Sequence, residues 1–205
     1  MSEQTAGQRQ AWRAACALSD ALRERLPAAI GAQKGLKTGK LLYEVQKIGG
    51  EQVALALSVP LMARENRRDV EVAWINVQVS VAGNGLPLTA GGDPVGEAVV
   101  HVAHWACEFS FEYDAYIGFP ATAWQPWAAI EGGRVRWEES ESPYGDEWLY
   151  TLPLAALSDA SAIDALIVAP VLAGLTRGEC AYPLPGQLSY VAVATEDGTD
   201  LRVDA

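Results

Sequence analysis

Residues 99–117 read VVHVAHWACEFSFEYDAYI, and this stretch decides the fold class predicted for the chain. From Trp105 onward, apolar side chains alternate with polar ones, and the polar row is largely acidic. A period of two is the period of a β-strand, so we expect one apolar and one acidic face. Such a stretch is too long for one straight strand, so we expect a bend or break near Ala103 and His104.

Segments on both sides of this stretch predict further strands. Alternating apolar residues predict a hairpin over residues 40–48 and 52–59, which Pro60 should end. Residues 64–69 are expected to form an exposed, charged loop. Residues 70–81 predict a strand with a one-residue shift of its apolar phase, which indicates either a bulge or a strand whose first half is covered on both faces. We expect this strand to pair antiparallel with the stretch that begins at Val99.

The C-terminal half predicts shorter strands. Residues 134–138 and 147–152 favour two of them, and a last hairpin should turn at Asp197 and Gly198. Residues 121–130 favour a short helix or an irregular loop, because Pro126 interrupts a helical spacing of tryptophans.

Two helices complete the prediction. Apolar residues at helical spacing predict an N-terminal helix over about residues 5–30, which Pro27 should end or kink. A second helix near 159–175 should be capped by Ser158 or Asp159 and kinked or stopped near Pro170. The whole chain, residues 1–205, is therefore predicted to be a single α+β domain. It should consist of a mostly antiparallel sheet of about six to eight strands with both helices packed against it.

Composition and charge restrict the partners. Half of the residues are apolar and 20% are charged, which supports a sizeable core. Residues 1–69 carry a net charge of +4 and residues 70–205 carry −15, which sum to −11. We expect no nucleic-acid partner, because the acidic segment repels phosphate, and we expect a basic protein partner instead. The lack of a long apolar run predicts no membrane partner.

The sequence predicts a cytoplasmic protein without a cofactor. The polar N-terminus shows no secretory signal, and the three widely spaced cysteines favour reduced, buried thiols. The loop KGLKTGK, residues 34–40, differs from a phosphate-binding loop in its glycine spacing. We predict no nucleotide site there.

The two histidines predict no metal site. His101 and His104 would share a helix face with Glu97 and Glu108, but the β-branched residues around them favour a strand. In a strand the two rings point to opposite faces, with His101 in the core and His104 half-exposed. No catalytic residue is assigned, and His104 would be the better general base because it shares a face with Glu108.

The aromatic composition supplies the candidate site. Twelve of the 17 aromatic residues lie between Trp105 and Tyr150, among several carboxylates. Aromatic anchors with a charged rim are typical of protein-recognition surfaces, although a core role for most of these rings is an equal alternative. The partner-binding residues predicted here are Trp124, Trp127, Glu138, Glu139, Glu141, Tyr144, Asp146 and Glu147.

Three functions agree with these observations. The first is a non-enzymatic, acidic protein-binding module, for example an immunity- or antitoxin-type inhibitor of a basic protein. The second is a small hydrolase that uses carboxylates in the aromatic-rich region 105–150. The third is a structural subunit that forms a homodimer through an edge strand.

Overall fold

The computed structural model describes residues 6–81, 97–113, 115–118, 128–137, 146–177, 183–196 and 198–204. The helical elements are α1 (Ala6–Gly31), the 3-10 turn η1 (Leu154–Ala156), α2 (Ala160–Ile163), the π-helical turn η2 (Asp164–Val168) and α3 (Ala169–Arg177). The strands are β1 (Leu42–Ile48), β2 (Glu51–Glu65), β3 (Arg68–Ser80), β4 (Val99–Trp105), β5 (Ala128–Glu131), β6 (Arg134–Trp137), β7 (Glu147–Pro153), β8 (Ser189–Thr195) and β9 (Gly198–Asp204).

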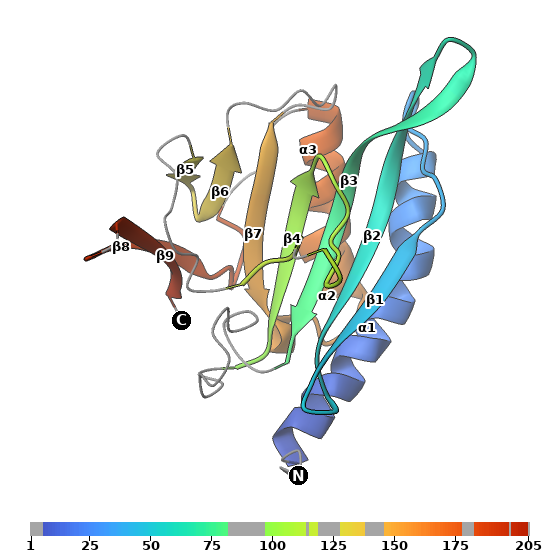
Figure 1. The fold of residues 1–205 in the computed structure, drawn as a ribbon. Helices are drawn as coiled ribbons and strands as arrows, with labels where there is room; N and C mark the ends of the chain where they lie inside the picture. Colours follow the sequence, from blue (N-terminus) through green and yellow to red (C-terminus); the bar gives the residue numbers. More distant parts are fainter. Residues whose placement is uncertain are drawn as a thin grey trace.

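The first seven strands form one antiparallel sheet in the order β1-β2-β3-β4-β7-β6-β5, and β8 and β9 form a separate hairpin (Figure 1). The pairing of β3 with β4, predicted from the sequence, is confirmed. The predicted bulge is also present, because the register of β2 and β3 skips Val72. The fold class is α+β, as the periodicity predicted.

Helices cover one face of the sheet (Figure 1). On this helix face, α1 packs on β2, and residues of α2, η2 and α3 pack over β4 and β7 in one large apolar cluster. The opposite face, which we call the second face, is covered by residues 106–113 and 115–118 and by the β8–β9 hairpin. The sheet is therefore buried on both sides, which explains why β3 and β4 lack a clean alternation.

The stretch Val99–Ile117 breaks after Trp105, one residue beyond the predicted region of Ala103 and His104. Strand β4 ends at Trp105, and residues 106–113 and 115–118 leave the sheet and lie across its second face. Their alternation predicted burial only in part. Phe109, Phe111 and Ile117 of the predicted apolar face are buried, but Cys107 and Tyr113 of that face are exposed, and Ser110 of the polar face is buried. The expectation of a continued strand is wrong because their backbone bonds to side chains of β3, as described below.

The prediction that Pro60 ends the hairpin is also wrong. Strand β2 continues to Glu65, and residues 64–69 are the tip of a second hairpin rather than a loop. The Pro60 carbonyl accepts a hydrogen bond from the Gly39 N–H, so the proline nitrogen points to the same side. The pairing of β1 with β2 begins at Leu42 and Ser58, so Pro60 lies past the end of β1. Strand β1 therefore requires no N–H donor from Pro60.

Three smaller differences concern helix ends and short strands. Helix α1 continues through Pro27 to Gly31, and the second helix continues through Pro170, although a π-helical turn precedes that proline. Asp159 is the N-cap, with its side chain accepting from the Ala162 N–H at 2.9 Å. Residues 128–130 belong to β5, so the helix or loop predicted there is wrong for them.

Candidate functional site at the aromatic end of the sheet

One end of the sheet brings the described part of the predicted site together. Register places Trp137 opposite Glu147 and opposite Ala128, and the end of β4 is beside the start of β7. Six predicted residues lie outside the described residues, namely Trp124, Trp127, Glu138, Glu139, Glu141 and Tyr144.

Two tryptophans form the aromatic part of this end on the second face. The rings of Trp105 and Trp137 stack with centroids 5.9 Å apart and planes inclined by 16°. The ring of Phe109 meets Trp105 edge-on at 5.4 Å. Both tryptophans are half-buried, so they keep surface toward solvent while their neighbour Phe109 belongs to the core.

Glu147 lies beside this pair and already has a partner. Its Oε1 accepts a hydrogen bond from the Ala106 N–H at 2.7 Å. Burial raises the pKa of the Glu147 carboxyl, and hydrogen bonds from Ala106 and from the Trp105 side chain partly offset that shift. Partial burial, and then the carboxylates of Glu108 and Glu147, raise the pKa of the exposed Cys107 thiol.

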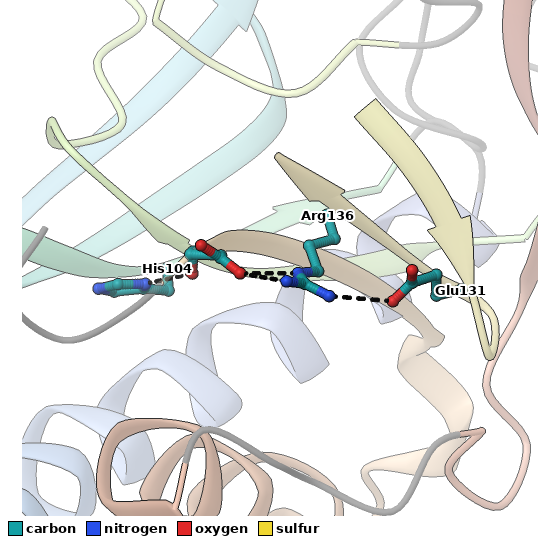
Figure 2. A network of polar contacts seen from close by, with 4 residues as sticks. His104, Glu131 and Arg136 are labelled. Atoms are coloured by element: carbon teal, nitrogen blue, oxygen red, sulfur yellow. Dashed lines mark hydrogen bonds and ion pairs between the residues drawn. The ribbon is translucent and has the colours of Figure 1, made fainter. Parts of the chain in front are cut away.

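A polar network occupies the helix face at the same end (Figure 2). Arg136 donates from Nε to Asp146 Oδ2 at 2.8 Å, and its Nη1 lies 3.4 Å from Glu131 Oε2. Hydrogen bonding to Asp146 is the main reason that the pKa of Arg136 is raised. The Nδ1 atom of His104 is 3.0 Å from the Asp146 carbonyl oxygen, so this nitrogen carries the hydrogen as donor.

The two histidines do point to opposite faces, but the predicted exposure of His104 is wrong. His104 is buried on the helix face against Trp148, with ring centroids 5.9 Å apart, and burial lowers its pKa. It does not share an acidic face with Glu108, because β4 ends between them. Burial lowers the pKa of His101 to about 3, so this ring is neutral at physiological pH.

A row of buried polar side chains lies on the second face, and its role was not predicted from the sequence. Gln78 accepts from the Ile117 N–H at 2.9 Å and donates to the Ile117 carbonyl at 2.7 Å. The Asn76 side chain makes the same two kinds of hydrogen bond nearby. It accepts from the Phe109 N–H at 3.1 Å and donates to the Cys107 carbonyl at 3.0 Å. These two amides replace the ladder that a neighbouring strand would supply. The only sequence signal was their spacing of two within β3.

The same row continues toward the β8–β9 hairpin. The Nδ1 atom of His101 lies 2.8 Å from the Thr151 hydroxyl, which in turn contacts the buried Tyr190 hydroxyl. Burial raises the pKa of Tyr190, so its phenol stays protonated. This chain joins β4, β7 and β8 through side chains and holds the hairpin on the sheet.

Metal-binding groups, membrane-spanning helices and thiols were also compared with the predictions, for the described residues. No group of three His, Cys, Asp or Glu side chains there is placed to hold a metal ion. No helix in the described part of the chain is long and apolar enough to cross a membrane. The expectation of buried thiols is wrong for Cys107, which is exposed; Cys16 is half-buried, and Cys180 lies outside the described residues. Comparison with protein-family models, curated proteins and solved structures finds no match for this chain.

Proposed function

We propose that this chain is a non-enzymatic binding module whose acidic, aromatic end engages a basic protein. An immunity- or antitoxin-type inhibitor of a cationic protein is the concrete version. The observation that carries the proposal is the half-buried Trp105–Trp137 stack, with Glu147 beside it.

The physical argument combines anchors with charge. Half-buried tryptophans bury further apolar area when a partner covers them, and such rings dominate binding energy at protein interfaces. The net charge of −15 over residues 70–205 attracts a basic partner and speeds its encounter. The match between this charge and a cationic surface also disfavours acidic competitors.

The contacts of the described polar groups favour binding over catalysis. The Asp146 carboxylate is paired with Arg136, and Glu147 accepts the Ala106 N–H. Both histidines are buried, and burial lowers the pKa of each. These groups are held by contacts within the chain, whereas a hydrolase needs an acid and a nucleophile or base directed at substrate.

The test compares matched charge variants. The triple variant Glu138→Gln/Glu139→Gln/Glu141→Gln removes three charges of the site predicted from the sequence, and Glu24→Gln/Glu51→Gln/Glu65→Gln removes three elsewhere in the sequence. The partner is first isolated from the native cell with the wild-type chain as bait, and association rates are then measured at low and high salt. We expect a basic partner, a rate that falls with salt, and a larger loss for the first variant.

Two outcomes contradict the proposal. An association rate that does not change with salt would remove the electrostatic argument. Loss of a catalytic turnover by orders of magnitude in the first variant would instead identify a carboxylate enzyme, since a binder loses affinity gradually. A mass that doubles with concentration would support the homodimer, for which β1 and β5 are the edge strands of the seven-stranded sheet.

We also propose a cytoplasmic setting for this function. Cys16 and Cys107 are both free thiols, and an exposed thiol such as Cys107 persists best in a reducing compartment. Thiol titration of the chain in intact cells tests this assignment, and oxidation of Cys107 there would contradict it.

A further inference from the structure

A groove of about 800 Å³ lies between α1 and the segment that leads into α2. One wall is α1 from Gly7 to Arg25, and the other is formed by residues between Leu154 and Ile163. Its volume lies in the range of known ligand-binding sites. The groove lies outside the candidate site, since none of its lining residues belongs to the aromatic end.

Most of the residues that α1 presents to the groove lie on one face of the helix. Six of them recur at steps of four and three residues, which average 3.6, the period of an α-helix. This groove stripe consists of Gly7, Ala11, Ala14, Leu18, Ala21 and Arg25. A separate set on α1 is buried against the sheet and second helix, for example Ala15, Leu22 and Leu26. The two sets meet at Leu18, which lines the groove and is itself buried in the core, so the groove is the open border of the apolar face of α1.

The shape of the groove suits a helix better than a small molecule. Alanines on both walls, such as Ala14, Ala17 and Ala160, are exposed, so the groove is open rather than enclosed. Their small side chains let a second helix approach α1 closely, as in knobs-into-holes packing. From Gly7 to Arg25 the wall is about 27 Å long at the rise of an α-helix, which is five turns.

The charges at the groove define the kind of helix. Two lining carboxylates, Glu97 and Asp159, are exposed. The one lining cation among the described residues, Arg25, is already paired, with its Nη1 at 2.7 Å from both carboxylate oxygens of Asp164. The remaining charge is negative, so it complements lysine or arginine beside an apolar stripe.

We propose that this groove docks a basic, amphipathic helix of the partner protein, packed along α1. The inference rests on the proposed function, because it assigns to the same basic partner a second, apolar contact. The acidic end then speeds the encounter, and the groove supplies the buried apolar contact that slows dissociation.

The test uses a synthetic probe and a matched control variant. The probe is a fluorescent peptide of about 18 residues, enough for 27 Å of helix, with leucine at coiled-coil seam positions and lysine elsewhere. The groove variant is Ala14→Gln/Ala17→Gln, and the control is Ala28→Gln, which changes an exposed alanine of α1 outside the groove lining. All three positions are exposed, and glutamine is a good helix former, so the fold should be retained.

Binding is followed by fluorescence anisotropy, and circular dichroism checks the fold of each variant. We expect the groove variant to raise the Kd of the peptide about tenfold or more, as for a blocked central contact, and the control to leave it unchanged. A peptide with glutamate in place of lysine should bind at least about tenfold more weakly, because the groove carboxylates repel it.

The negative results separate this inference from the proposed function. If the groove variant binds the peptide like wild type, the groove assignment is overturned. A salt-sensitive complex with the basic partner would then leave the proposed function intact. Equal binding of the lysine and glutamate peptides also overturns the inference. So does a self-associated chain that becomes monomeric in the groove variant, since a second copy would then be the occupant.

Discussion

Replacing Tyr150 by phenylalanine tests how the fold tolerates a proline inside its second helix. The Tyr150 hydroxyl is fully buried and donates to the Leu166 carbonyl at 3.0 Å. In an α-helix that carbonyl would accept from the residue four positions later, which is Pro170 and has no N–H. The π-helical turn over Asp164–Val168 directly precedes this proline. The tyrosine therefore supplies the donor that the helix lacks.

The magnitude follows from the loss of one buried hydrogen bond. Tyr150→Phe removes the donor but keeps the ring, and it leaves the Leu166 carbonyl without its tyrosine donor. We expect the free energy of unfolding to fall by about 1–3 kcal/mol, the cost of orphaning a buried polar group. For a chain of this length, each kcal/mol corresponds to a fall in Tm of roughly 2–4 °C.

A second substitution, at Pro170, tests whether the tyrosine compensates for the proline. Pro170→Ala restores an N–H that can donate to the Leu166 carbonyl, so Tyr150→Phe should cost about 1 kcal/mol less in that background. Urea unfolding followed by tryptophan fluorescence is a suitable assay, because the Trp148 ring stacks on Tyr150 at 5.8 Å. An equal cost in both backgrounds would refute the link to the proline. A cost near zero in the wild-type background would refute the role of the hydroxyl.

Two further predictions concern the second face of the sheet. Because burial lowers the pKa of His101 to about 3, the unfolded chain takes up a proton first as pH falls below the usual value near 6.5. The stability that the neutral ring contributes is complete above that pH, and it should fall by about 3 kcal/mol at pH 4.5, as measured by urea unfolding. His101→Gln should lose most of this dependence, and an unchanged profile would contradict it. Gln78→Leu should cost about 2–4 kcal/mol, since it orphans both the N–H and the carbonyl of Ile117, and it should speed amide exchange at residue 117. Exchange there at the wild-type rate would show that Gln78 does not hold this segment.

Much of the architecture followed from local patterns. Period-two runs predicted β3, β7 and the β8–β9 hairpin, and the one-residue phase shift predicted the bulge in β3. Asp159 was one of two predicted caps, and it does accept the Ala162 N–H. These features depend on neighbours within a few residues, so the sequence contains the information that determines them.

The candidate site was less predictable. Of its eight residues, only Asp146 and Glu147 lie in the described part, and both make contacts that no local pattern indicates. Arg136 lies in β6, and Asp146 directly precedes β7. Their ion pair therefore depends on the pairing of these two strands. The stacking of Trp105 on Trp137 likewise requires β4, β7 and β6 to be neighbours.

The sequence by itself determined the α+β class, most strand positions and the separation of basic and acidic halves, because periodicity and charge are local properties. Only the tertiary structure decided that residues 106–113 and 115–117 leave the sheet. Their alternation is the same whether a strand or the side chains of Asn76 and Gln78 satisfy their backbone, and those partners are 33 and 39 residues away. The groove on α1 could not be predicted either, because the sequence shows the apolar face of a helix but not how much of that face the sheet will cover.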